Sequence, residues 1–578
     1  IVSPPQLEQP EIKAAGKRIV VELQDSLKAN TTYTIDFSDA ISDNNEGNPM
    51  GNYTYTFSTG ERIDTFEVAG NVLEAKNLEP VKGILVGLYD DLSDSAFQTK
   101  PLMRVARTDG RGRFVIKGVA PGQYRVYALQ DVDGNYLFNQ KSEMIAFSHQ
   151  TFTPSAGPDT RQDTIWRDSL HIDNIIRVPY THFYPDDVVL MAFEETPTDR
   201  YLIKTDRTDA DRIKMVFSIG HEQLPAIRGL NFNSDNAFVL ESSLKKDTLT
   251  YWLRDTTLIN QDTLRMERTY LISDSTGALV SLTDTIEAVP KYSYEKRLKQ
   301  RKREWEDWYK QQQKQKRHGE KYDSIMPLPP LRPKYNAAQQ MEPDGVITIE
   351  IPTPLEKLDT AAIHLYSQID SLWYNASFNF HPKDSMLRHF EIEAEWRPGT
   401  EYSLEIDSAA FTDIYGKASN TFKTGIRVRE LDEFCTLSFR LSGVTDTTIV
   451  VQLLNQSDNV LKETTADNMT ADFNYINPGT YYLRAFIDSN RNGIWDTGDY
   501  ANDRAPEEVY YYPRTIECKA KWDIQLPWNL TAAQRTLQKP SEITKQKPDK
   551  EQQKLRNRNA ERARRLGIEY VKDKQYSK

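Results

Sequence analysis

Alternating apolar and polar residues are the strongest pattern at the start of the chain. Tyr33, Ile35 and Phe37 fall on one side of a stretch whose intervening residues are polar, and residues 53–57 repeat the pattern. A period of two predicts half-buried strands. Residues 43–49 between them are rich in Asn and Gly, which favour tight turns. The sequence therefore predicts a strand-turn-strand unit.

Two sequence patterns each occur twice in the chain. The first returns at residues 399–425, where a Thr-x-Tyr strand, an Asp/Gly turn and a Phe-x-Thr-Gly exit follow the same order as in residues 31–60. The second combines a Pro-Gly turn, a Tyr-containing strand and an Asp ten residues after the Pro. It occurs at Pro121–Asp131 and at Pro478–Asp488. The equal spacing predicts a duplicated pair of modules.

The period changes to that of a helix over residues 294–318. A narrow apolar stripe is flanked by Lys, Arg, Gln and Glu, and the proline-rich residues 327–333 cannot continue a helix. The stripe contains Tyr294, Leu298, Trp305, Trp308 and Tyr309. It could bind a partner, but packing against a neighbouring domain is the interpretation we favour.

Length and composition fit a mainly β protein of several domains. A chain of 578 residues is too long for one core, and its thirty tyrosines suit strands better than helices. Short alternating or apolar runs separated by polar turns fill residues 175–290, as expected of a further sandwich. No run reaches the ~20 apolar residues that a membrane span needs.

Charge is distributed unevenly. Residues 291–334 and 531–578 each hold 14 basic and 6 acidic residues, a net +8 each, which leaves the rest of the chain at −27. Dedicated nucleic-acid binding would need basic residues on a folded face, so we expect no nucleic-acid partner. The tail at 531–578 has few apolar residues, and we expect it to be disordered or a fraying helix.

The two cysteines, Cys435 and Cys518, fall at the opening and closing strands of one predicted module. The first and last strands of a sandwich can be neighbours, so a disulfide and two buried free thiols are both open interpretations. Neither cysteine has the partner spacing of a zinc site.

The modules resemble known families. Residues 30–60 and 399–425 resemble bacterial Ig-like domains of the SbsA type, and residues 64–165 and 434–528 resemble transthyretin-like or carboxypeptidase-regulatory-like β-sandwiches. Their order is similar to that of the SbsA Ig-like domain-containing lipoproteins of Bacteroidota, with residues 3–60 the most specific part. The resemblance implies a lipid-anchored protein at the outer membrane. It also implies a preceding half Ig domain, so we expect the first sandwich to lack its N-terminal strands.

The expected fold is therefore tandem Ig-like and transthyretin-like β-sandwiches with one inserted amphipathic helix and a disordered or helical tail. The predicted divisions are 1–62 (partial SbsA-like Ig domain), 63–174 (transthyretin-like), 175–290 (β-sandwich), 291–334 (basic helix and Pro-rich linker), 335–430 (second Ig-like domain), 431–530 (second transthyretin-like domain) and 531–578 (basic tail).

One loop has the spacing of a calcium site. Oxygen donors at positions 1, 3, 5, 9 and 12, a glycine at 6 and a backbone carbonyl at 7 follow the EF-hand order. The predicted ligands are Asp488, Asn490, Asn492, Ile494, Asp496 and Asp499. A calcium ion would make the loop rigid, whereas the alternative is a polar loop held by Asx turns. The first-copy loop at 131–135 has its glycine two positions too early, and we expect it to bind no ion.

Enzyme signatures are absent from the sequence. The eight histidines show no metal-ligand spacing, and we expect His381 and His389 to be surface residues. There is no Gly-x-Ser-x-Gly elbow and no phosphate-binding Gly-Lys-Ser/Thr loop. The many carboxylates of acidic loops do not single out a catalytic pair. We therefore expect a protein that is not an enzyme.

The functional prediction is a structural or protein-interaction scaffold at the outer membrane with an outer-membrane protein as partner, such as a barrel-assembly complex. A surface glycan- or ligand-binding module using exposed Tyr and Trp is the alternative. Asp-Ser/Thr followed by a small or apolar residue, as in Asp247-Thr248-Leu249, recurs along the chain. It is similar to the O-glycosylation acceptor of exported Bacteroidota proteins, and turn-to-strand junctions are the alternative reading.

Overall fold

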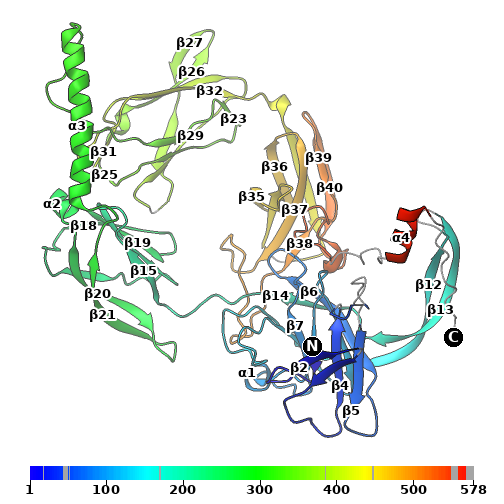
Figure 1. Ribbon diagram of the computed structural model, residues 1–578. Helices are drawn as coiled ribbons and strands as arrows, with labels where there is room; N and C mark the ends of the chain where they lie inside the picture. Colours follow the sequence, from blue (N-terminus) through cyan, green and yellow to red (C-terminus); the bar gives the residue numbers. More distant parts are fainter. Residues whose placement is uncertain are drawn as a thin grey trace.

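The computed structural model describes residues 1–16, 18–38, 40–42, 50, 53–167, 171–384, 386–445, 448–548 and 558–567. The fold is mainly β, built from tandem sandwiches (Figure 1). This confirms the predicted fold class. The turn expected at 43–49 lies outside the described residues.

The N-terminal sheet confirms the first alternating strand. The polar face of this strand, which was expected to be exposed, is covered by the next module. The antiparallel order is β1 (Val2–Ser3), β4 (Thr32–Ser38) and β5 (Tyr53–Ser58), beside a hairpin of β2 (Glu11–Ala15) and β3 (Arg18–Glu22). Tyr33 is buried and stacks on Phe57. Thr32 is buried too, and its carbonyl accepts a 2.7 Å bond from Arg104 of the next module. The strand is thus covered on both faces, because the neighbouring module packs against its polar side.

The next module is a two-sheet sandwich. One sheet has the order β11-β10-β7-β8, and the other has the order β14-β6-β9. The strands are β6 (Phe66–Glu74), β7 (Leu85–Tyr89), β8 (Arg104–Arg107), β9 (Arg113–Val119), β10 (Arg125–Leu129), β11 (Ile145–Ala146) and β14 (Val188–Ala192), with a short helix α1 (Ala96–Thr99).

Strand β14 differs from the expected division of the chain. The sequence placed residues 188–193 in the following sandwich, but β14 pairs in parallel with β6. Its inward residues Val188 and Leu190 join the core of the first sandwich. The hydrophobic pattern of the strand indicates that it is buried, but it does not indicate which strand it pairs with.

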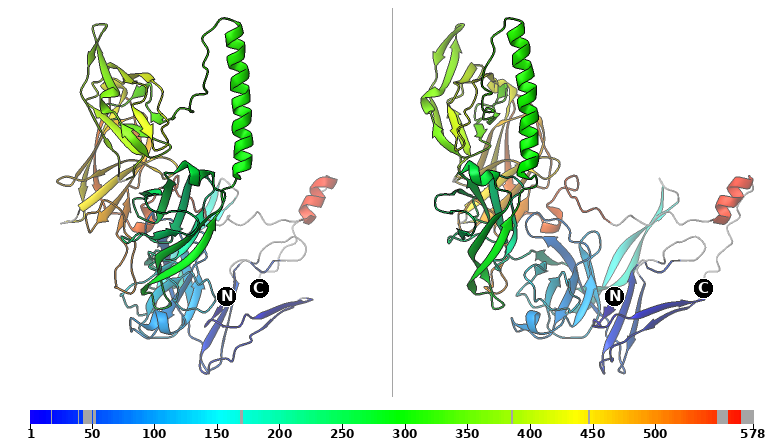
Figure 2. Two further views of the ribbon diagram at one scale, coloured as in Figure 1. Left: turned by 90° about the vertical axis from the view of Figure 1, so that its left-hand side faces the viewer. Right: turned by 60° about the vertical axis from the view of Figure 1, so that its left-hand side comes forward.

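A long ribbon separates β11 from β14. Strands β12 (Ser155–Trp166) and β13 (Ile172–Tyr184) pair with each other alone, and the ribbon extends away from the sandwich (Figures 1 and 2). The division expected near residue 174 therefore falls inside β13. The side chains of Ile172, Ile175 and Ile176 are exposed. A two-stranded ribbon is marginal in water on its own.

The middle sandwich pairs β15-β16-β19-β18 in one sheet and β17-β20-β21 in the other. Its elements are β15 (Leu202–Asp206), β16 (Arg212–Phe217), β17 (Ala226–Gly229), β18 (Phe238–Ser242), β19 (Thr248–Leu253), α2 (Thr256–Asn260), β20 (Leu264–Ser273) and β21 (Leu279–Ala288).

The predicted helix is confirmed as α3 (Tyr294–Arg317), which is capped by the Ser293 side chain. The favoured packing of its aromatic stripe is wrong: α3 buries none of its residues and stands away from the sandwiches (Figure 2). Trp305 and Tyr309 stack on each other at 5.1 Å and are each 46% exposed. Its contacts with the middle sandwich are at the first turn, where the Tyr294 N–H donates to Asp262 and Arg297 pairs with the same residue.

The second Ig-like module has a four-stranded sheet, β22-β24-β29-β28, and a five-stranded sheet, β23-β32-β30-β26-β27, with β25 paired to β31. Its elements are β22 (Lys334–Asn336), β23 (Gln340–Met341), β24 (Ile347–Glu350), β25 (Leu355–Leu358), η1 (Thr360–Ala362), β26 (Ile363–Ile369), β27 (Leu372–Asn375), β28 (Phe378–Pro382), β29 (His389–Ala394), β30 (Glu401–Ile406), β31 (Phe411–Asp413) and β32 (Phe422–Val428).

The last module pairs β36-β33-β40 in one sheet and β35-β34-β37-β38 in the other, with β39 beside β37. Its elements are η2 (Leu431–Glu433), β33 (Cys435–Ser442), β34 (Thr448–Leu454), β35 (Val460–Thr465), β36 (Thr470–Ile476), β37 (Gly479–Asp488), β38 (Val509–Tyr511), β39 (Ile516–Cys518) and β40 (Asp523–Asn529). Cys435 and Cys518 are free thiols in its core, which is the second of the two interpretations.

Residues 531–548 differ from the expected disordered or fraying-helical tail, because part of this segment is buried. A short turn η3 (Arg535–Leu537) precedes buried Gln538 and Ile543, and helix α4 (Arg558–Leu566) lies further on. Ile543 joins a core formed between the first and last sandwiches, with Leu78 on one side and Tyr482 on the other. Local composition could not predict this order, because the residues that bury the segment lie in distant parts of the chain.

The order of the modules in space is a closed circuit. The chain leaves the first sandwich after β14 and runs through the middle sandwich, α3 and the second Ig-like module. It then returns, so that the last sandwich packs on the first (Figure 1). Among the described residues, no helix is long and apolar enough to cross a membrane.

Candidate functional site

The predicted calcium loop begins where β37 ends. Asp488 is 2% exposed, and its carboxylate accepts bonds from the backbone N–H of Asn492 at 3.1 Å and of Gly493 at 2.8 Å. Gly493 has a φ of +75°, which permits this tight turn. Asp488 and Gly493 therefore lie at the turn that the sequence predicted, and the role of Asp488 as a calcium ligand stays a prediction.

The middle of the loop is held by side-chain hydrogen bonds. Asp496 Oδ2 accepts the amide N–H groups of Asn490 at 2.5 Å and of Asn492 at 2.8 Å. Asn492 Oδ1 in turn accepts the backbone N–H of Ile494, whose side chain is exposed. These are the Asx-type bonds that the sequence left as the alternative to an ion. Five of the six predicted residues thus lie in one compact loop.

Asp499 is the residue that the structure separates from the others. Its carboxylate accepts the backbone and side-chain N–H groups of Asn502, and its backbone pairs with Arg504. Glu507 approaches the loop instead: Oε1 accepts the N–H of Ser489 at 2.7 Å, and Oε2 accepts that of Asp496 at 3.0 Å. The twelve-residue pattern could not find Glu507, because this residue lies beyond its last position.

The tip of the same loop docks on the first sandwich. The ring of Tyr500 lies edge-on to Phe97, Phe138 and Phe147, at centroid distances of 5.1–5.8 Å. Its hydroxyl donates to the carbonyl of Asp94. Aromatic edge-to-face contacts of this kind are favourable beyond the area that they bury. The loop predicted as a metal site is therefore also a link between two modules.

Further polar bonds join the loop to the segment after β14. Thr497 donates to the carbonyl of Glu194 at 2.6 Å, and the backbone N–H of Tyr500 donates to buried Glu195. His149 of the first sandwich pairs with Asp503 at 2.5 Å. These contacts fix the orientation of the loop on the first sandwich.

A buried ion-pair cluster makes a second link. Lys539 Nζ lies 2.7 Å from Glu79 of the first sandwich and 2.8 Å from Asp458 of the last, and the side chains of Lys539 and Asp458 are each 4% exposed. Lys539 also donates to the carbonyl of Asn77 at 2.9 Å. One ammonium therefore satisfies groups from both modules.

The environment of Glu79 shows the balance of forces in this cluster. Burial raises the pKa of this carboxyl, but hydrogen bonds from Lys539 and from the backbone N–H groups of Lys545 and Gln546 outweigh it and leave the pKa below its usual range. Glu79 is therefore ionised at neutral pH, and the terminal segment supplies the groups that keep it so.

The equivalent loop of the first copy also gathers carboxylates. Atoms of Asp131, Asp133 and fully buried Glu143 lie within 4.8 Å of one another. Glu143 accepts the N–H of Val132 at 3.1 Å, as Glu507 accepts that of Ser489 in the second copy. The prediction that this first loop binds no ion stays a prediction.

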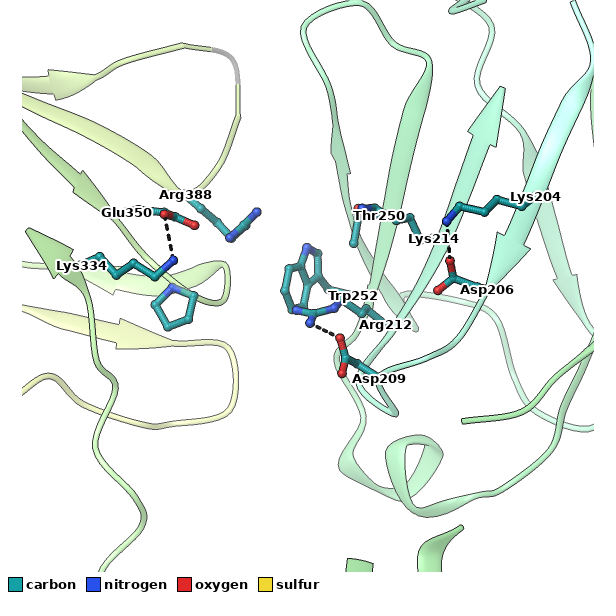
Figure 3. Close-up of a pocket in the computed structure, with 11 residues that line it drawn as sticks. Lys204, Asp206, Asp209, Arg212, Lys214, Thr250, Trp252, Lys334, Glu350 and Arg388 are labelled. Atoms are coloured by element: carbon teal, nitrogen blue, oxygen red, sulfur yellow. Dashed lines mark hydrogen bonds and ion pairs between the residues drawn. The ribbon is translucent and has the colours of Figure 1, made fainter. Parts of the chain in front are cut away.

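A cleft of about 490 Å³ separates the middle sandwich from the second Ig-like module (Figure 3). The ring of Trp252 lies under the guanidinium groups of Arg212 and Arg388, and Arg388 also pairs with Glu241 at 2.9 Å. The carboxylates that line the cleft each have a cation beside them: Asp206 with Lys204, Asp209 with Arg212, and Glu350 with Lys334. The eleven lining residues include no histidine, cysteine or serine.

Comparison with known proteins identifies the N-terminal part. Residues 1–59 match the family described as Bacterial Ig-like domain. No curated protein matches the chain. Solved structures with similarity include the major pilin subunit BcpA of Bacillus cereus, with 10% identity over 81% of this chain and 100% of the pilin and a TM-score of 0.13. They also include the titin I-band fragment I67–I69, with 12% identity over 57% of this chain and 98% of the fragment and a TM-score of 0.11.

The third similar structure is native alpha-2-macroglobulin from Escherichia coli, with 10% identity over 31% of this chain and 69% of that chain and a TM-score of 0.16. The family match and the tandem sandwiches both indicate a protein built from Ig-like β-sandwich domains. The chain carries an N-terminal bacterial Ig-like domain within a series of β-sandwiches, an architecture that indicates a structural or interaction module.

Proposed function

We propose that this chain is a non-enzymatic scaffold of the bacterial cell envelope. Its first and last sandwiches form one rigid base, and the modules between them carry surfaces to a partner protein. The observation that carries the proposal is the double link between distant parts of the chain, Tyr500 among the aromatic residues of the first sandwich and Lys539 between Glu79 and Asp458.

The finer proposal is a lipid-anchored subunit of an outer-membrane complex, such as one for barrel assembly. It is supported by the resemblance of the module order to SbsA Ig-like lipoproteins of Bacteroidota and by the Bacterial Ig-like match at residues 1–59. In such a protein the Asp-Ser/Thr sites would carry O-linked glycans. The carboxylates of Asp255, Asp274 and Asp359 each accept a backbone N–H two residues on, in agreement with a turn role at those sites.

Calcium has a structural role in this proposal. The residues that fit the ion are Asp488, Asn490, Asn492 and Asp496 with the carbonyl of Ile494, and Glu507 takes the place that the sequence assigned to Asp499. Oxygen donors of this kind suit a hard cation. When bound, calcium would replace the bonds between the two asparagines and Asp496 and stiffen the loop that carries Tyr500.

The partner surfaces that we propose are α3 and the β12-β13 ribbon, because both extend away from the base with exposed apolar side chains. Helix α3 carries ten basic and four acidic residues beside the stacked Trp305 and Tyr309. The ribbon exposes Ile175. The glycan-binding alternative stays a prediction. It requires exposed aromatic side chains on loops, whereas the exposed aromatic pair lies along a helix.

Site-specific photo-crosslinking in intact envelopes tests this proposal. A crosslinking amino acid is placed at Tyr309 or at Ile175, and at Trp522 as an equally exposed control on the last module. We expect the first two positions to yield the same discrete crosslinked outer-membrane protein and the control to yield none. Equal crosslinking at all three positions, or none at any, would contradict a partner bound through α3 and the ribbon.

A further inference from the structure

Three metal-ligand side chains lie together on the second Ig-like module, outside every site described above. His381 on β28 and Glu391 and Glu393 on β29 each bring a ligand atom within 4.8 Å of the others. The two strands pair in antiparallel register, with His381 directly opposite Glu391. The cluster spans both strands, so no spacing along the sequence could reveal it.

The pleat of the sheet directs these three side chains away from the core. Phe380 and Ile392 alternate with them along the strands and pack inward. Residues two apart on a strand share a face, and residues opposite each other across an antiparallel pair lie within side-chain reach. His381, Glu391 and Glu393 therefore converge on the solvent side of β28 and β29.

The imidazole of His381 is oriented as a metal ligand would be. Its Nδ1 lies 3.0 Å from the carbonyl oxygen of Pro382. A carbonyl can only accept, so Nδ1 carries a proton and Nε2 is the nitrogen that faces the carboxylates, where a metal ion would replace any proton that it holds. Nε2 lies 3.5 Å from Glu393 Oε2. Metal-bound histidines in proteins commonly donate their second ring N–H to a carbonyl in this way.

The two carboxylates keep oxygen atoms for a ligand. Lys383 Nζ lies 3.1 Å from Glu391 Oε1, which leaves Oε2 of the same group. The side chain of Lys383 is 49% exposed and can move into water, whereas that of Glu391 is 18% exposed and is held on the sheet. Lys383 is therefore a competitor for a cation at this position.

We infer that His381, Glu391 and Glu393 form a binding site for a divalent transition metal of the zinc class. One imidazole nitrogen and two carboxylate oxygens form a donor set that favours Zn²⁺ over Mg²⁺ or Ca²⁺, with water completing the coordination. The ion would join β28, at the edge of its sheet, to β29. From the sequence, His381 was expected to be a surface residue and not a metal ligand, and this proposal differs from that expectation.

Other histidines of the chain lack this arrangement and supply controls. In His182, Nδ1 lies 3.0 Å from Asp159 and Nε2 lies 2.9 Å from Asp186, so a carboxylate occupies each nitrogen separately. His364 has Asp407 beside its Nε2 as the one acidic residue paired with it. Neither brings two carboxylates to one nitrogen.

The test is calorimetric titration of the full chain, without a histidine tag, with Zn²⁺ in a buffer that contains excess Ca²⁺ to occupy oxygen-only sites. The variants are His381→Ala, Glu391→Gln, Lys383→Ala and the control His182→Ala. We expect one zinc site, with affinity lowered at least tenfold in the first two variants, in the range seen when the environment of a metal ligand is disturbed. Lys383→Ala should bind several-fold more tightly, because the competing ammonium is gone.

A purely structural role for the cluster predicts a different result. In that case His381→Ala and His182→Ala would have the same zinc affinity as the unaltered chain, and Lys383→Ala would not bind more tightly. Either finding overturns the assignment. Circular dichroism of each variant shows that the sheet is intact, so loss of zinc binding cannot be mistaken for loss of folding.

Discussion

Lys539 Nζ lies 2.7 Å from Glu79 Oε1, although the two residues belong to opposite ends of the chain. Replacing Lys539 with Met would leave two buried carboxylates without their cation. Loss of one partner from a buried cluster costs about 3–5 kcal/mol, and the side chain of Glu79 is 11% exposed against 4% for Asp458, so we expect the lower end of this range. Hydrogen exchange of residues 535–548 measures the effect. The control Lys334→Met removes an exposed pair with Glu350 and should change stability by less than about 0.5 kcal/mol.

The pH dependence of this link should be weaker in the variant. The lowered pKa of Glu79 means that the link is at full strength above pH 4.5, the ordinary value of the group, and is lost as pH falls through the lowered value. Without Lys539 the pKa of Glu79 should be higher, because burial remains while the hydrogen bond and the charge of the ammonium are lost, so acid should destabilise the link less than in the unaltered chain. An equal effect of acid on exchange in both proteins would contradict the assignment.

Tyr500→Ala should separate the first and last sandwiches. Removing a large, partly buried aromatic side chain costs on the order of 2–4 kcal/mol. We expect the radius of gyration from small-angle scattering to increase and Phe97 and Phe138 to lose protection from labelling. Tyr500→Phe removes only the bond to Asp94 and should cost about 1 kcal/mol. Tyr201→Ala, at a residue that is 57% exposed, should leave the radius unchanged.

His182 should make the β12-β13 ribbon sensitive to pH. Hydrogen bonds with Asp159 and Asp186 raise the pKa of the imidazole above 6.5. A raised value in the folded state gives a stabilisation that is complete below pH 6.5 and is lost as pH rises through the raised pKa. NMR titration of the ring should show this shift, and Asp159→Asn should move the midpoint back toward 6.5. A midpoint unchanged by Asp159→Asn would mean that the contact is absent in solution.

Calcium should raise the melting temperature of the chain through the 488–499 loop. Asp488→Asn and Glu507→Gln remove carboxylates that face the loop and should weaken the effect of calcium. Asp499→Asn should retain the effect, because Asp499 is bonded to Asn502. Differential scanning calorimetry with calcium and with a chelator provides the measurement. A melting temperature that neither addition changes would remove the metal from the proposal.

The local features of the fold could be predicted from the sequence. The alternation around Tyr33 and Ile35 gave a strand, and the change of period at Tyr294 gave a helix that ends within a residue of the predicted position. Asp488 and Gly493 were located because a tight turn needs its residues close together in sequence. Such features are determined by residues that lie close together in the sequence.

The features that join modules could not be predicted in this way. Lys539 lies in a segment with few apolar residues, and its burial depends on Glu79 and Asp458. Glu507 and the zinc-type cluster around His381 arise from residues that the fold brings together. Strand β14 was assigned to the wrong sandwich for the same reason, since its pairing with β6 is a long-range contact.

The closed circuit of modules affects how the chain responds to proteolysis. The middle sandwich is tethered to the base after β14, and the second Ig-like module is tethered to it before β33. Residues 319–329, between α3 and the second Ig-like module, are exposed and without regular structure, which is where cleavage is favoured. One cut there would leave two fragments of similar size, each still covalently attached to one half of a base that holds together without the bond.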